Sequence, residues 1–228
     1  MHVEIWSDIA CPWCYVGKRR FEAALAAFEH RDELRVTWRS FELDPGAPAE
    51  RVGDRAEHLA SKYGSSVEQA RAMQDQMTAT AAGEGLDFHF ETARAGNTFD
   101  AHRLVHLAAL HGRQDAMNER LMRGYLSEGE LMSDHAALER LAVEVGLDAE
   151  EVRETLATDR FAAEVREDER TAAALGISAV PCFVIDRRMG APGAQPPEVL
   201  TEFLQRGWDA RSPLEVVASG DACGPDGC

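Results

Sequence analysis

Cys11-Pro12-Trp13-Cys14 is the stretch that decides which fold we expect for this chain. It follows a short apolar run at residues 3–6 that predicts a strand, so Cys11 should stand at the start of a helix. The unpaired N–H groups and the dipole of a helix N-terminus favour an anion, and the thiolate is the form of cysteine that attacks disulfides. Pro12 suits the first helical turn because it has no N–H to leave unpaired.

The spacing gives each cysteine a role. We expect Cys11 to be the nucleophile and Cys14, one turn later and shielded by Trp13, to resolve the mixed disulfide. The competing interpretations are two inert buried thiols, or half of a zinc site completed by Cys223 and Cys228. Proline and tryptophan between the cysteines, and a helix that begins at them, favour redox chemistry and predict no metal site.

Hydrophobic periodicity extends this motif into a βαβ unit. Apolar residues continue at helical spacing to Phe28, and residues 34–39 alternate between apolar and polar side chains as a half-buried strand does. Almost everything from about Asp54 to Leu175 then has the pattern of helices. Their predicted caps include Ser133 or Asp134 at one start, with Gly146 as a stop.

The chain returns to a strand at residues 182–185. Arg187-Arg188 should begin a weak partner strand, and Gly190 and Pro192 would confine that strand to a sheet edge. A last helix begins around Pro196. The order βαβ … ββα, with paired cysteines at the first helix, predicts an α/β chain with a thioredoxin-like fold and a large all-helical insertion.

Val180-Pro181 is the second motif on which this interpretation depends. A proline before a strand cannot donate a ladder hydrogen bond, so it belongs at a strand start, an edge or a bulge. Thioredoxin-like folds hold a cis proline at this position, beside the active cysteines, and the backbone before it pairs with substrate peptide. We therefore expect a cis bond, with Val180 and Pro181 as substrate-binding residues.

These motifs resemble the DsbA family, specifically its FrnE-like branch, which is related to the 2-hydroxychromene-2-carboxylate isomerase-like proteins. The resemblance covers roughly residues 3–206 and implies disulfide oxidoreductase or isomerase activity. Cys182 departs from the pattern, because the family usually has an aromatic residue after the proline. The matching stretches are residues 7–18, Asn97-Thr98 with Ala101-His102-Arg103, Gly176-Ile177-Ser178 before Val180-Pro181, and residues 193–197.

The sequence leaves the roles of five further residues open. Cys182 is interpreted as a small apolar filler or as a third active thiol. Cys223 and Cys228 are a candidate second redox pair that could exchange with Cys11 and Cys14; the alternatives are an inert end of the chain or metal scavenging. Asp8 is expected to cap the first helix, or else to accept a proton from Cys14. His102 is expected to be an ordinary helix histidine, with lining of the active cleft as the alternative.

Length and composition limit the remaining choices. The 228 residues divide into 1–46 and 176–208 as the two halves of the thioredoxin-like domain, 47–175 as the helical insertion, and 209–228 as a cysteine-containing tail. The net charge of −16 argues against nucleic-acid and anionic-membrane partners, which require clustered cations. The N-terminal residues lack a signal-peptide pattern, and no apolar run is long enough for a membrane span, so we expect a cytoplasmic protein.

The predicted function is a cytoplasmic thiol–disulfide oxidoreductase or isomerase that acts on protein or peptide thiols and disulfides. No cofactor is expected, although glutathione is a candidate thiol co-substrate. One alternative is a glutathione-dependent isomerase of small aromatic compounds, which would have no use for the resolving thiol of Cys14. The other is a non-enzymatic peptide-binding chaperone, which would not need Cys11. The direction of the redox reaction depends on the reduction potential, and the sequence does not set it.

Overall fold

The computed structural model describes residues 1–211, and within this range the strands form a single sheet in the order β2-β1-β3-β4. β1 pairs in parallel with β2, and the β1–β3 and β3–β4 pairs are antiparallel. This topology confirms the α/β thioredoxin-like fold. The strands, with the two helices that lie together on one face of the sheet, are β1 (His2–Ser7), α1 (Pro12–Ala27), β2 (Arg35–Ser40), β3 (Cys182–Ile185), β4 (Met189–Pro192) and α9 (Pro197–Asp209).

From Arg55 to Ala174 the chain is helical, as predicted, apart from short connections and residues 84–98, where the expectation of nearly continuous helix is wrong. No helix among residues 1–211 is long and apolar enough to cross a membrane. Asp134 is the N-cap of α6 and accepts a hydrogen bond from the N–H of Ala136. The inserted helices are α2 (Arg55–Tyr63), α3 (Val67–Gly83), α4 (Phe99–Leu110), α5 (Gln114–Ser127), α6 (His135–Glu144), α7 (Ala149–Ala157) and α8 (Ala162–Ala174).

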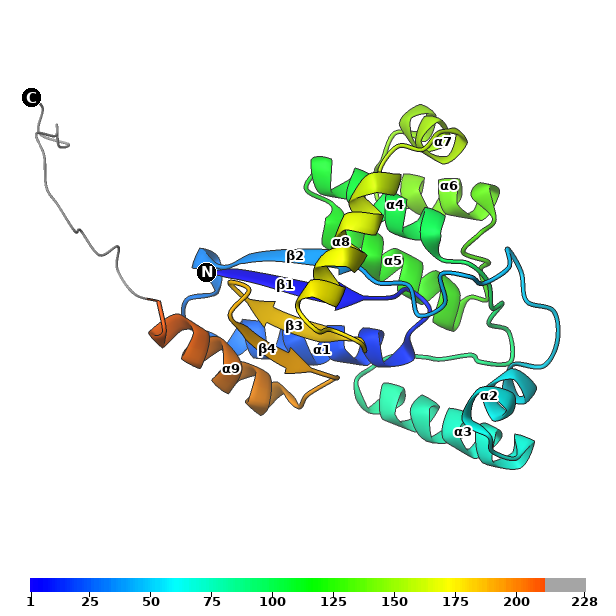
Figure 1. Cartoon of the computed structure of the whole chain (residues 1–228), viewed down its shortest axis with the longest axis horizontal. Helices are drawn as coiled ribbons and strands as arrows, with labels where there is room; N and C mark the ends of the chain where they lie inside the picture. The colour runs from blue at the N-terminus through cyan, green and yellow to red at the C-terminus, as the bar shows by residue number, and fades with distance from the viewer. Residues whose placement is uncertain (212–228) are drawn as a thin grey trace, which may run out of the picture.

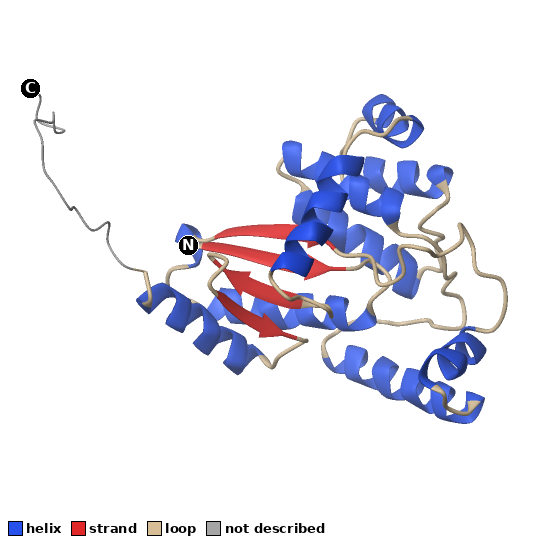
Figure 2. Cartoon of the chain, in the orientation of Figure 1, coloured by secondary structure: helices blue, strands red, loops and turns tan. Residues whose placement is uncertain are grey.

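The sheet is covered on both faces. α8 crosses one face, and α1 and α9 lie on the other (Figures 1 and 2). β3 illustrates the result, because its side chains alternate between the two layers. Phe183 and Ile185 join the main core with α1 and α9, whereas Cys182 and Val184 join a smaller cluster that includes Ala172 of α8.

The edge strands differ in part from the prediction. β4 lies at the sheet edge as expected, but it begins at Met189 and not at Arg187. Arg187 has φ +54°, in the left-handed region, so it belongs to the turn that precedes the strand. On the other edge, the side-chain amide of Gln114 accepts from the N–H of Trp38 and donates to its carbonyl, both at 3.0 Å. These bonds occupy backbone groups that an edge strand otherwise exposes.

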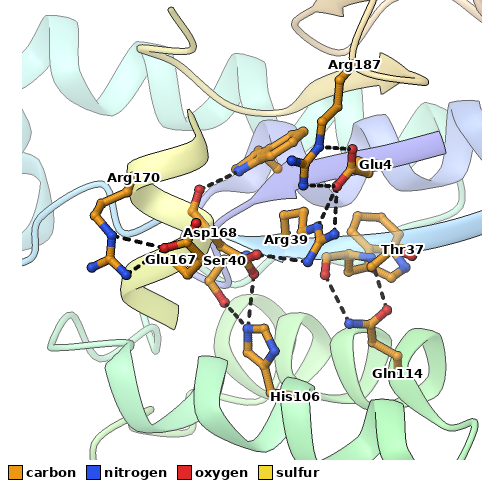
Figure 3. Close-up of polar contacts among 12 residues, drawn as sticks. Glu4, Thr37, Arg39, Ser40, His106, Gln114, Glu167, Asp168, Arg170 and Arg187 are labelled. Atoms are coloured by element: carbon orange, nitrogen blue, oxygen red, sulfur yellow. Dashed lines mark hydrogen bonds and ion pairs between the residues drawn. The ribbon is translucent and has the colours of Figure 1, made fainter. Parts of the chain in front are cut away.

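Arg39 connects the sheet to α8 through buried carboxylates (Figure 3). Its guanidinium lies 2.7 Å from Glu4 on β1 and 3.0 Å from Asp168 on α8, and Glu4 also pairs with Arg187. Asp168 further accepts from the backbone N–H of Ser40 at 3.0 Å. Burial raises the pKa of Glu4, but the bonds from Arg187 and Arg39 outweigh it, so its pKa lies below the ordinary value.

We predict that Arg39→Met lowers the free energy of unfolding by roughly 3 kcal/mol, because it removes the cation shared by two buried carboxylates. Urea denaturation at neutral pH measures the loss. Arg170→Met is the matched control: Arg170 on α8 pairs with Glu167, and both side chains are about two-thirds exposed. Arg170→Met should lower the free energy of unfolding by less than about 0.5 kcal/mol.

The same two proteins give a pH test. The lowered pKa of Glu4 means that its contribution is present above the ordinary glutamate pKa of 4.5 and is lost as pH falls through the lowered value. The stability difference between the parent and Arg39→Met should therefore narrow in acid. A difference that is the same at neutral and acid pH would contradict the assignment to ion pairing.

Candidate active site

Cys11 is the N-cap residue of α1, as predicted, and Pro12 follows as the first helical residue. The Cys11 N–H donates to the carbonyl of Asp8 at 3.2 Å, and the Cys14 N–H donates to the carbonyl of Cys11 at 3.0 Å. The first turn of α1, Pro12 to Tyr15, has no acidic residue in its sequence that would oppose a thiolate. The first turn of α1 therefore adds no negative charge to the positive end of the helix at Cys11.

The two cysteines differ in accessibility. Cys11 is 5% exposed, whereas Cys14 is fully buried in the main core. Burial raises the pKa of the Cys14 thiol well above its ordinary value; the neighbouring Cys11 adds to the rise, and the backbone of Asp8 and the hydroxyl of Ser7 oppose it. Trp13 is 46% exposed, and the main core, in which Cys14 lies, contributes to covering this thiol; that Trp13 shields it stays a prediction.

The Val180-Pro181 bond is cis, which confirms the prediction. The carbonyl oxygen of Val180 lies 3.7 Å from Cys11 Sγ, close enough to accept a hydrogen bond from the thiol. The carbonyl of Pro181 accepts from the N–H of Gly193 at 2.7 Å, so β4 and the loop after it hold this turn in place. The fold thus brings together the two motifs that the sequence analysis placed at the site.

Gly17 explains how α1 can approach this turn so closely. A Cβ atom at this position would lie 2.9 Å from Cγ of Pro181 and 3.5 Å from the ring of Phe183. Glycine inside a helix costs up to about 1 kcal/mol relative to alanine. Here it gives the room that α1 needs to pack against Pro181, one turn beyond Cys14.

Asp8 does not cap the first helix, so that expectation is wrong, and its alternative role as proton acceptor for Cys14 stays a prediction. Its carboxylate accepts from the N–H of Leu43 at 2.8 Å and of Ala10 at 3.2 Å, while Cys11 begins the helix without a side-chain cap. Nε2 of His102 lies 3.4 Å from the same carboxylate, without hydrogen-bond alignment. Both oxygens of Asp8 are therefore directed to Leu43, Ala10 and His102.

The environment of Asp8 keeps it ionised. Burial raises the pKa of its carboxyl, but the imidazole of His102 and the N–H groups of Leu43 and Ala10 lower it further, to below the ordinary value. His102 is itself buried, and α4 carries it. Sequence reasoning missed this pair because 94 positions separate the two residues, although both stand in stretches that carry the family resemblance.

The remaining cysteines lie apart from this arrangement or outside the described residues. In the described part of the chain Cys11, Cys14 and Cys182 are free thiols. Cys182 packs in the smaller cluster under α8, and burial raises the pKa of its thiol, as expected for an apolar filler. Cys223 and Cys228, the candidate second redox pair, lie outside the described residues.

Comparison with known proteins agrees with this geometry. The family model of the DSBA-like thioredoxin domain matches residues 2–205. The probable DsbA oxidoreductase SCO1869 from Streptomyces coelicolor is 53% identical, with a TM-score of 0.94 over 100% of this chain and 98% of its own. The uncharacterized protein YwbO of Bacillus subtilis is 27% identical over 90% of this chain and 96% of its own.

A more distant structure shows the same fold. The cytosolic disulfide reductase DsbM from Pseudomonas aeruginosa, solved with GSH, superimposes with a TM-score of 0.64 over 92% of this chain and 100% of its own. Its sequence is 20% identical, so the likeness extends to the fold alone.

We predict that Asp8→Asn lowers the free energy of unfolding by about 2 kcal/mol, because an asparagine has one acceptor oxygen where two backbone N–H groups need one each. Urea denaturation measures the loss. The contribution of Asp8 is present above the ordinary aspartate pKa of 3.8 and is lost as pH falls through its lowered value, so the difference should shrink in acid.

Asp134→Asn is the matched control. Asp134 is an exposed N-cap that accepts one backbone N–H, and asparagine fills an N-cap equally well. Its stability should change by less than about 0.5 kcal/mol. Equal effects of the two substitutions would mean that the buried contacts of Asp8 contribute nothing special to this turn.

Proposed function

The chain belongs to the family of DSBA-like thioredoxin domains, an oxidoreductase fold, and we propose on this basis that it exchanges thiols and disulfides with protein or peptide substrates through Cys11 and Cys14. The observation that carries the proposal is the difference between Cys11 and Cys14 in accessibility and position on α1. Cys11 is the more accessible thiol, at the positive end of α1, and Cys14 is fully buried one turn later with a raised pKa. A nucleophile and a resolving thiol need this difference.

In the reductive direction, the Cys11 thiolate attacks one sulfur of a substrate disulfide. The substrate S–S bond breaks, its second sulfur leaves as a thiolate and takes up a proton, and a mixed disulfide with Cys11 remains. Cys14 then loses its proton and attacks Cys11 Sγ, which releases the first substrate sulfur as a thiol. Two electrons have passed to the substrate, and Cys11 and Cys14 are joined by a disulfide. Oxidation of a substrate dithiol follows the same steps in reverse.

The surroundings of Cys11 support a peptide as substrate. The Val180 carbonyl lies beside Cys11 Sγ, and the backbone before the cis proline is the position at which an extended peptide can pair with this fold. Trp13 adds an exposed aromatic surface directly after Pro12. We therefore assign Val180 and Pro181 to substrate binding, with Trp13 as an apolar contact.

We place the activity in the cytoplasm, where the thiols of Cys11, Cys14 and Cys182 would stay reduced between turnovers. The proposal includes no bound cofactor, and glutathione would serve as the thiol that reduces the Cys11–Cys14 disulfide. Whether the protein acts as reductase, oxidase or isomerase depends on the reduction potential of this pair relative to the compartment. Equilibration with defined mixtures of reduced and oxidised glutathione measures that potential.

We predict that Cys11→Ser abolishes the reduction of insulin disulfides, because it removes the attacking sulfur. Cys14→Ser should instead accumulate mixed disulfides between Cys11 and substrate, which non-reducing electrophoresis and mass spectrometry detect. Iodoacetamide at pH 6 should label Cys11 before Cys14 in the reduced parent, since Cys14 is buried and its raised pKa keeps it protonated.

Cys182→Ala is the control, because its thiol lies in the cluster under α8. It should retain the parent's activity and labelling pattern. Preferential labelling of Cys14 would reverse the assigned roles. Full activity of Cys14→Ser on a small aromatic substrate, without mixed disulfides, would favour the glutathione-dependent isomerase, and unchanged peptide binding by Cys11→Ser with an inactive parent would favour the chaperone.

A further inference from the structure

A second concave surface lies apart from the cysteines, between the α2–α3 hairpin and the loop at residues 90–95. This groove has a volume of about 700 Å³, a size typical of sites for small molecules or peptide segments. Its walls come from residues 50–56, the facing side of α3 and residues 90–95. The hairpin and the N-terminal end of α1 lie at the same end of the molecule (Figure 1).

Arg55 is the unusual residue of this groove. It is partly buried, with its guanidinium carbon 5.1 Å from the ring centre of Phe90 and 5.5 Å from that of Tyr125. Nη1 donates to the Tyr125 hydroxyl at 2.6 Å. Among residues 1–211, no carboxylate lies within ion-pair distance of Arg55. The side chain is thus held between two aromatic rings, while its other N–H donors have no anionic partner in the described chain.

The other arginines of the groove are neutralised. Each makes an ion pair with a carboxylate at 2.8 to 3.0 Å, namely Arg51 with Asp44, Arg71 with Asp54 and Arg94 with Glu50. The chain has 40 acidic residues against 24 lysines and arginines, so carboxylates are plentiful. A partly buried guanidinium that pairs with none of those described is costly to desolvate unless a ligand supplies the anion.

Both walls of the groove continue into the segments that hold Asp8. Leu43, which donates its N–H to Asp8, begins the loop that leads to Arg55. On the other side, the chain runs from residues 90–95 to α4 and His102, which lies against the same carboxylate. The segments that form the groove are thus continuous in sequence with those around Asp8, and the hairpin lies at the same end of the molecule as the N-terminal end of α1 (Figure 1).

We propose that Arg55 binds a carboxylate of the substrate peptide, outside the segment that reacts at Cys11. The proposal rests on the proposed function and adds a preference for substrates with an acidic residue or a free C-terminus near the disulfide. A planar guanidinium pre-positioned by two rings matches the two oxygens of a carboxylate. Asp75, which also lines the groove, would repel a polyanion, so an isolated carboxylate fits better than a nucleic acid.

The test uses three synthetic peptide disulfides that differ only in charge. One is neutral and amidated, one is amidated with a single glutamate in an arm beside the disulfide, and one is neutral with a free C-terminal carboxylate. For the parent, kcat/KM should be about five-fold higher for at least one carboxylate peptide than for the neutral one, mainly through KM. The peptide that shows the preference identifies the source of the carboxylate. Added salt should reduce it.

Arg55→Gln should bring the ratio of kcat/KM between the carboxylate peptide and the neutral peptide to about one. Arg206→Gln is the matched control, because it removes the same charge from an exposed position on α9, outside the groove. It should keep the preference. Tyr125→Phe removes the hydroxyl that holds Nη1 but leaves the cation and both rings, so it should also retain most of the preference. If Arg55→Gln does not fold, Arg55→Lys replaces it and should show a reduced preference.

A binding assay separates this proposal from the proposed function. Fluorescence anisotropy with labelled, cysteine-free versions of the three peptides measures binding to the groove in the absence of thiol chemistry. Binding of a carboxylate peptide that Arg55→Gln weakens supports the site even if the parent reduces no disulfide, which would refute the proposed function alone. Equal binding and turnover of all three peptides, or a preference that Arg55→Gln leaves unchanged, would refute the site.

Discussion

The close packing of α1 against the Val180-Pro181 turn is the constraint on which the rest of the site depends. These segments come from opposite ends of the thioredoxin-like domain, and they meet because Gly17 has no side chain that would collide with Pro181. This contact fixes how closely the N-terminal half of α1 packs against the turn. It thereby leaves Cys11 beside the Val180 carbonyl and carries Cys14 into the core.

The helical insertion is part of the structure that supports this contact. Through α4 it supplies His102 to the carboxylate of Asp8, in the turn that precedes Cys11. Through α8 it covers the other face of the sheet and supplies Asp168 to Arg39. Buried carboxylates are tolerated at both places because cations or N–H groups surround them. The insertion is thus joined to the thioredoxin-like domain by buried charged groups at two separate places, at the turn before Cys11 and at the face of the sheet under α8.

Local signals made much of the fold predictable. The start of α1 at Cys11, the alternation that became β2 and the N-cap at Asp134 each depend on neighbours within a few residues, which the sequence displays directly. The position of β4 was less predictable. Arg187 was expected to begin that strand, but it adopts a left-handed turn conformation, which depends on how the hairpin closes and not on its own propensity.

The sequence by itself determined the paired cysteines, the helix that begins at them and the proline that accompanies them, because those features are written in short motifs with a direct physical meaning. Only the tertiary structure decided what surrounds them. Asp8 found its partners at Leu43 and His102, and Arg55 came to lie between Phe90 and Tyr125. These contacts join residues far apart in the chain, and no local pattern records which distant groups the packing of helices will bring together.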